Sequence, residues 1–110
     1  MIRSMGFALA LIVGVTAAAG AQDAGTKGQQ VFTDQKCSLC HSIAGKGNAK
    51  GALDEVGGKL SPAEIRAWIT DAKGMIAKTK AIRKPEMKQY TLPKDEVDAL
   101  VAYLSSLKSR

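Results

Sequence analysis

The chain has 110 residues, of which 16 are Lys or Arg and 10 are Asp or Glu, so its formal net charge is +6. This length fits one small domain. Aromatic residues make up only 5% of the chain and the basic residues are scattered along it, a composition that argues against a nucleic-acid-binding surface. The positive charge instead indicates either a solvated basic surface or a docking face for an acidic protein partner.

The first residues have the pattern of a secretory signal peptide. Arg3 supplies the positive start, residues 6–19 are uncharged and apolar, and the small residues before Gln22 fit a cleavage site after Ala21. An uncleaved membrane anchor is the alternative. It is disfavoured because this run of 14 apolar residues is shorter than the roughly 20 that a bilayer span needs.

Cleavage at this site defines the domain organisation. Residues 1–21 form the signal peptide, and residues 22–110 form a single domain of 89 residues without a membrane span. Loss of Arg3 leaves 15 basic and 10 acidic residues and therefore a net charge of +5. We expect the mature protein to be periplasmic or otherwise exported, and to be a monomer.

The first predicted helix spans residues 23–36. Gly28, Val31, Phe32 and Gln35 recur at helical spacing in this segment and form a short apolar edge. In a domain of 89 residues a core of side chains alone is marginal, so an additional staple would help its stability.

Cys37, Cys40 and His41 follow this helix in the pattern Cys-x-x-Cys-His, the attachment signature of a c-type haem. Two thiols about one helical turn apart can add to the two vinyl groups of a haem. The imidazole that follows the second thiol can then become an axial ligand of the iron. These residues are the only two cysteines and the only histidine of the chain, and they predict one covalently attached haem c.

Three other uses of the cysteines are weaker. A disulfide across Cys-x-x-Cys would close a very short loop and constrain the unfolded chain little. A thioredoxin-like dithiol needs a βαβ context, and the sequence shows no strand pattern. A zinc site needs a fourth ligand, which would have to come from a residue other than cysteine or histidine.

A glycine-rich loop over residues 42–59 separates the haem motif from the second predicted helix, at residues 61–74. Glycine suits a backbone that turns tightly or passes close to a flat ligand. Ser61 and Glu64 form a capping box at the start of the helix, and Gly74 is a plausible end.

Residues 75–92 have no sustained periodicity, so we expect an extended loop that wraps a ligand. The last predicted helix begins near Pro93, and Lys108 and Arg110 suit its C-terminal end. Its apolar stripe recurs at helical spacing and consists of Val97, Leu100, Val101, Leu104 and Leu107.

Taken in order, these motifs resemble those of class I cytochrome c, in particular the small single-haem cytochromes exported by bacteria. The resemblance covers essentially the whole mature chain, and it is specific because six motifs occur in the family's order. They are Gly28–Phe32, Cys37–His41, the loop His41–Gly47, Glu64–Ile69, Lys84–Lys88 and Leu100–Leu104.

The resemblance implies an all-α fold with three main helices and glycine-rich loops around the haem. The first and last helices would cross at Gly28, where the missing side chain lets two backbones approach. Phe32 and Tyr103 would pack around this crossing.

The resemblance also implies Met87 as the second axial ligand, because it follows a proline shortly before the last helix. Met75 is the competing candidate. A His41/Met87 pair would raise the reduction potential of the iron and leave no open position for a substrate. Trp68 would bind the haem, either by donating its indole N–H to a propionate or by packing on the haem edge alone.

Two positions depart from the family pattern. Ala52 stands where proline is common in the loop that accepts a hydrogen bond from the proximal imidazole. Its carbonyl group could still accept that bond. Glu86 stands beside the ligand methionine where a second proline is common, and a carboxylate near the haem would slightly favour the ferric state.

The function implied is that of an electron carrier, not an enzyme, whose partners are redox proteins with acidic docking faces. Two alternatives remain: a haem-binding subunit of a larger oxidase or dehydrogenase complex, and a haem-based redox or gas sensor. The lysines that we expect to steer a partner are Lys36, Lys46, Lys50, Lys80 and Lys88.

Overall fold

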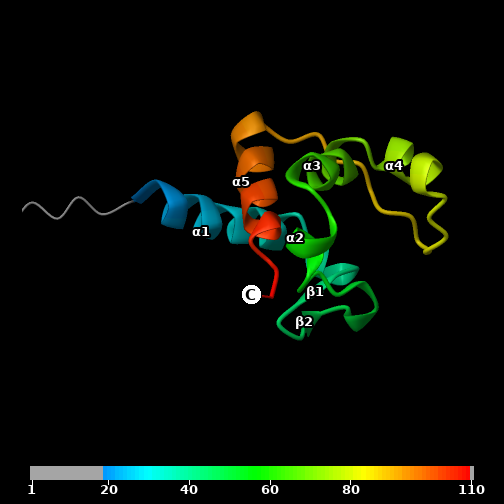
Figure 1. The fold of residues 1–110 in the computed structure, drawn as a ribbon, viewed down its shortest axis with the longest axis horizontal. Helices are drawn as coiled ribbons and strands as arrows, with labels where there is room; N and C mark the ends of the chain where they lie inside the picture. Colours follow the sequence, from blue (N-terminus) through cyan, green and yellow to red (C-terminus); the bar gives the residue numbers. More distant parts are fainter. Residues whose placement is uncertain (1–18, 110) are drawn as a thin grey trace, which may run out of the picture.

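A computed structural model describes the backbone of residues 19–109 and the side chains of residues 25–109. This part of the chain is mostly helical and has one small two-stranded sheet (Figure 1). The predicted all-α fold is confirmed. Most of the predicted signal peptide, residues 1–18, lies outside the described part of the chain.

The elements follow one another with short connections until the last long loop. The α-helices are α1 (Ala19–Asp34), α2 (Val56–Lys59), α3 (Pro62–Thr70), α4 (Ala72–Thr79) and α5 (Lys94–Ser105). Two 3-10 helices, η1 (Cys37–Leu39) and η2 (Ala49–Gly51), flank an antiparallel hairpin of β1 (Ser42–Ile43) and β2 (Lys46–Gly47).

Helix α1 crosses α5 at Gly28, as the sequence predicts (Figure 1). A Cβ atom at this position would overlap the carbonyl oxygen of Ala99 and the side chain of Tyr103. The ring of Phe32 meets that of Tyr103 edge to face, with centroids 6.4 Å apart and planes at 72°. The absent side chain therefore lets the two helices approach closely enough for these aromatic rings to pack beside the crossing.

The segment predicted as a second helix and a loop forms two helices instead. The capping box of Ser61 and Glu64 is present at the start of α3, but α3 ends at Thr70. The side chain of Asp71 then accepts a hydrogen bond from the backbone of Gly74 and begins α4. Gly74 thus lies in the first turn of a new helix, and the irregular segment begins only after Thr79.

The ends of the first and last predicted helices are also corrected. Helix α1 ends at Asp34 because Lys36 adopts a left-handed backbone conformation, with φ of 56°. Helix α5 ends at Ser105, before the predicted Lys108. The chain after it turns towards α2, where Ser109 donates two hydrogen bonds to Glu55.

The core lies between α1, α3 and α5. Its buried residues are Val31, Phe32, Ile65, Ile69, Val97, Leu100, Val101 and Leu104. No helix in the described part of the chain is long and apolar enough to cross a membrane.

Candidate cofactor site

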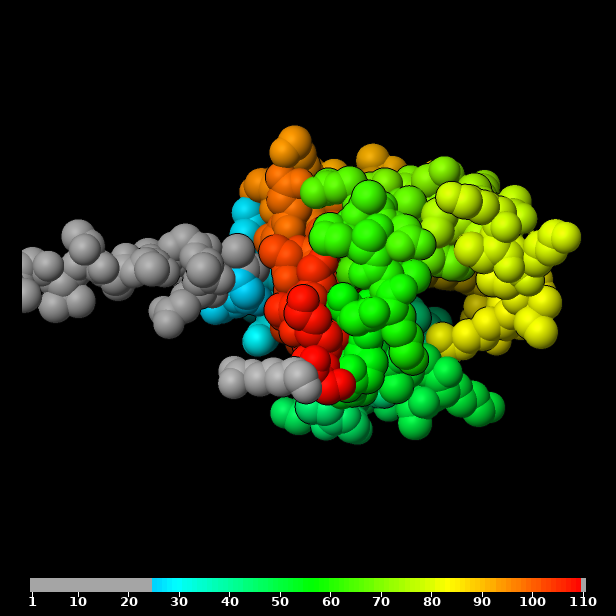
Figure 2. All heavy atoms as spheres, in the orientation of Figure 1, coloured from blue at the N-terminus to red at the C-terminus, as the bar shows by residue number. Residues whose placement is uncertain are grey.

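One cavity of about 350 Å³ lies beside the core. Core residues such as Phe32, Ile65 and Leu100 form part of its wall. The irregular segment after α4 closes another side, and Figure 2 shows an opening in the surface beside this segment, coloured yellow. A largely apolar cavity of this size is typical of a small-molecule or cofactor site.

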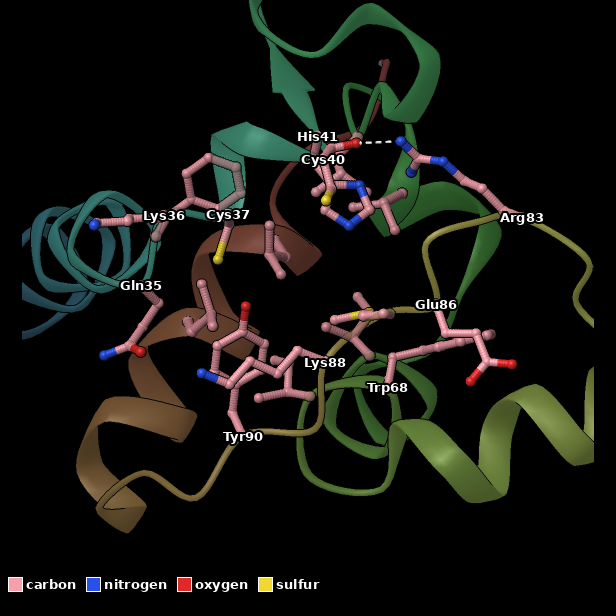
Figure 3. A pocket seen from close by; sticks show the side chains of 18 of the residues that line it. Gln35, Lys36, Cys37, Cys40, His41, Trp68, Arg83, Glu86, Lys88 and Tyr90 are labelled. Carbon is pink, nitrogen blue, oxygen red and sulfur yellow. Dashed lines mark hydrogen bonds between the residues drawn. The ribbon is translucent and has the colours of Figure 1, made fainter.

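The two cysteines and the histidine lie together on the wall of this cavity (Figure 3). Helix η1 holds them in one tight turn, because the backbone N–H groups of Cys40 and His41 both donate to the carbonyl oxygen of Cys37, at 3.1 and 2.9 Å. Neither thiol forms a disulfide. Burial raises the pKa of the Cys37 thiol, so this thiol is uncharged at neutral pH.

The ring of His41 is oriented by the chain itself. Its Nδ1 atom lies 2.9 Å from the carbonyl oxygen of Gly51 and donates a hydrogen bond to it, which leaves Nε2 free to bind a metal. Burial lowers the pKa of this imidazole, and the nearby charge of Arg83 lowers it further. His41 is thus held in the neutral form that metals require.

The hydrogen-bond acceptor differs from the one expected at Ala52. Gly51 ends η2 and directs its carbonyl group at the imidazole, whereas Ala52 pairs with Ser42 in an isolated bridge. A Cβ atom on Gly51 would overlap the carbonyl oxygen of Cys40 and lie 2.9 Å from His41 Nδ1. The sequence signal for this acceptor was Gly51 itself, a glycine directly before the expected Ala52.

The two candidate methionines lie in different surroundings. Met87 lines the cavity. Met75 lies on α4, is only 8% exposed and is not part of the cavity wall. Only Met87 therefore shares a cavity with His41.

Trp68 and Glu86 also line the cavity, and both lie across it from Cys40 and His41 (Figure 3). Among the described residues, none accepts a hydrogen bond from the Trp68 indole. The carboxylate of Glu86 accepts a hydrogen bond of 2.9 Å from Lys84, which lowers the pKa of Glu86. The charge of Glu86 is thus partly balanced within the loop.

Arg83 is a site residue that the sequence analysis did not single out. Its Nη2 atom donates a hydrogen bond of 2.6 Å to the carbonyl oxygen of Cys40, across 43 residues of sequence (Figure 3). Its place four residues before Met87 was visible in the sequence, but the direction of its side chain was not.

These features fit a haem. The cavity is apolar, two free thiols and a neutral imidazole share one wall, and a thioether reaches the same space. Within the described residues, His, Cys, Asp and Glu nowhere gather in a group of three or more that could hold a metal ion by protein ligands alone.

Comparison with known proteins gives two matches. A family model described as "Cytochrome c" matches residues 25–108. The "Cytochrome c oxidase subunit 2" of Alkalihalophilus pseudofirmus (strain ATCC BAA-2126 / JCM 17055 / OF4) is 30% identical over 91 residues. That alignment covers 74% of this chain and 25% of the relative, so the chain spans about a quarter of the relative's length. No solved structure matches the chain significantly.

Proposed function

Because the chain belongs to the cytochrome c family, whose domain binds haem c covalently, we propose that it is an exported, monomeric carrier of one electron through a single haem. The bound haem supplies an iron that alternates between the ferric and ferrous states. The observation that carries this proposal is the shared cavity of Cys37, Cys40, His41 and Met87. The chain contributes attachment, axial ligation, an apolar surrounding and a docking surface.

In this proposal Cys37 and Cys40 would attach the haem through two thioether bonds, and His41 and Met87 would bind its iron. The free Nε2 atom of His41 and the position of Met87 on the cavity wall support this assignment. Iron held by both residues would be closed to a substrate, which favours electron transfer over enzymatic chemistry. Trp68 would bind the haem, because its indole N–H has no acceptor among the described residues and suits a propionate oxygen.

The proposed docking surface surrounds the two most exposed large apolar side chains of the described chain. Leu39 is 71% exposed between the two cysteines, and Ile82 is 89% exposed next to Arg83. The hydrogen bond from Arg83 to Cys40 joins the two segments that carry them. An apolar centre with a basic rim suits brief contact with an acidic redox protein. The expected steering lysines are all exposed: Lys36, Lys46, Lys50, Lys80 and Lys88.

Salt and charge reversal test this carrier role. We would measure the second-order rate of reduction by a reduced flavodoxin, used as an acidic one-electron donor, at increasing salt. The rate should fall with ionic strength. Lys50→Glu, next to the Gly51 that contacts His41, should slow it several-fold at low salt. Lys108→Glu, which makes the same change of net charge beside Gly58 of α2, should not. Rates that are independent of salt, or equal effects of the two variants, would contradict this docking surface.

Export is the second part of the proposal. The charged start, the apolar run and the small residues before Gln22 support cleavage after Ala21. N-terminal sequencing of the protein from its native cells should read from Gln22. A mature protein that retains Met1 would contradict cleavage.

Membership of a larger oxidase complex is the second candidate, because the matched relative is an oxidase subunit. Size-exclusion chromatography with light scattering, applied to gently lysed native cells, separates the two candidates. The full chain alone has a mass of 11.6 kDa. A free carrier that has lost its signal peptide should elute as a monomer with less than the combined mass of the full chain and one haem. Co-elution of all the protein with oxidase activity would support the subunit instead.

A further inference from the structure

Arg83 is the charged side chain that connects the loop of Met87 to the attachment turn. Its guanidinium donates to Cys40, the residue directly before His41, at 2.6 Å. Gly51 makes room for it, because a Cβ atom at Gly51 would overlap Arg83 Nη1. The guanidinium, the carbonyl oxygen of Cys40 and the imidazole of His41 therefore meet around one glycine.

The loop that follows α4 has no regular structure between Lys80 and Pro93. Long-range hydrogen bonds fix it on either side of Met87, including a long one of 3.4 Å from the backbone N–H of Lys73 to the side chain of Gln89. Arg83 holds the preceding part to Cys40, and the backbone N–H of Tyr90 holds the following part to the carbonyl oxygen of Ile69 at 2.9 Å. Arg83 therefore supplies the long-range hydrogen bond that fixes the part of the loop before Met87.

Building on the proposed function, we infer that Arg83 is a positioning residue that holds Met87 opposite His41 and raises the reduction potential of the haem. Ferric iron carries one more positive charge than ferrous iron, so a fixed cation beside the proximal ligand favours the ferrous state. Arginine remains charged at all accessible pH values. Its contribution is consequently constant with pH.

Two variants separate the electrostatic role from the positioning role. Arg83→Gln removes the charge, and Arg83→Lys keeps the charge but loses the forked donor. Lys78→Gln is the matched control, because it removes one charge from an exposed position on α4. We would measure the reduction potential of each haem-loaded protein. We would also measure the affinity of its ferric form for added imidazole, which competes with Met87.

In Arg83→Gln the ratio of ferrous to ferric protein at a fixed potential should fall about fivefold relative to Lys78→Gln; a tenfold change corresponds to about 59 mV. Arg83→Lys should keep a potential close to that of the wild type. Both Arg83 variants should bind imidazole more tightly than the control does.

Equal potentials in Arg83→Gln and Lys78→Gln would overturn the electrostatic role. Unchanged imidazole affinity in Arg83→Lys would overturn the positioning role. Neither result contradicts the carrier function if the wild-type protein still accepts electrons from flavodoxin. A wild type that exchanges no electrons would contradict the carrier function itself.

Discussion

The Nδ1 atom of His41 donates a hydrogen bond to the carbonyl oxygen of Gly51 at 2.9 Å. This contact fixes the ring orientation and tautomer of the proposed proximal ligand through the backbone of η2. It depends on the absence of a side chain at Gly51, where a Cβ atom would overlap the backbone of Cys40.

Gly51→Ala should therefore destabilise the haem-loaded protein by about 1–3 kcal/mol, because backbone on both sides must shift. Gly58→Ala is the matched control, since its added Cβ atom would lie 3.6 Å from Lys108 in ordinary contact. Chemical denaturation, followed by the visible absorption of the haem, measures both. Equal unfolding midpoints would show that η2 tolerates a side chain at Gly51.

The helix crossing gives a second prediction. Gly28→Ala should lower the free energy of unfolding by about 1–3 kcal/mol, because the new Cβ atom meets Ala99 and Tyr103. Gly25→Ala, in the same helix with nothing within 4 Å of its added Cβ atom, should raise it by about 0.5–1 kcal/mol through helix propensity. Thermal unfolding of both variants should give shifts of opposite sign; two shifts of the same sign would count against close packing at Gly28.

The ion pairs of Asp98 predict a pH dependence of stability. Its carboxylate accepts hydrogen bonds from Lys94 at 2.7 Å and Arg66 at 2.6 Å, and these lower its pKa. Because the folded pKa lies below the unfolded one, the stabilisation is present above the unfolded value, about 4. It is lost as the pH falls through the folded pKa.

Asp98→Asn should accordingly be less stable than the wild type at pH 7, and this difference should shrink on acidification. Urea unfolding between neutral and acidic pH measures the effect. Glu96→Gln in the same helix is the control, because no ion pair of Glu96 occurs in the described part of the chain. A constant difference between Asp98→Asn and the wild type at all pH values would rule out this linkage.

Removal of the haem should leave a loosely packed protein. Phe32, Ile65, Ile69, Leu100 and Leu104 belong both to the core and to the cavity wall, so an unfilled cavity deprives the core of contacts on one side. We expect apoprotein that retains much of its far-UV circular dichroism and loses its near-UV signal. A sharp near-UV spectrum with cooperative thermal unfolding would contradict this expectation.

The sequence predicted those features that depend on residue type and short spacing. Cys37, Cys40 and His41 share a pentapeptide, Ser61 and Glu64 form a local cap, and Gly28 combined a helical pattern with a family motif. Each is specified within a few residues or by a recognised motif. The cytochrome c family and the all-α fold followed from the order of these motifs, and both are confirmed.

The features that the sequence did not predict depend on contacts between distant segments or on a residue that can cap either of two helices. Asp71 could end one helix or begin the next. Its side chain accepts a hydrogen bond from the backbone of Gly74, and this cap starts α4. Gly51 and Ala52 offer similar carbonyl groups, and the turn of η2 directs that of Gly51 at His41. Arg83 contacts a residue 43 positions away, which no local pattern reveals.

The central proposal is an iron held between His41 and Met87 and closed to substrates. The visible spectrum of the ferric, haem-loaded protein tests it most directly, because a thioether ligand gives a long-wavelength charge-transfer band. Wild type and Met75→Ala should show this band, although Met75→Ala should lose about 2–5 kcal/mol of stability because Met75 is buried. Met87→Ala should lack it. A band that persists in Met87→Ala, or that is absent from the wild type, would contradict the proposed closed site.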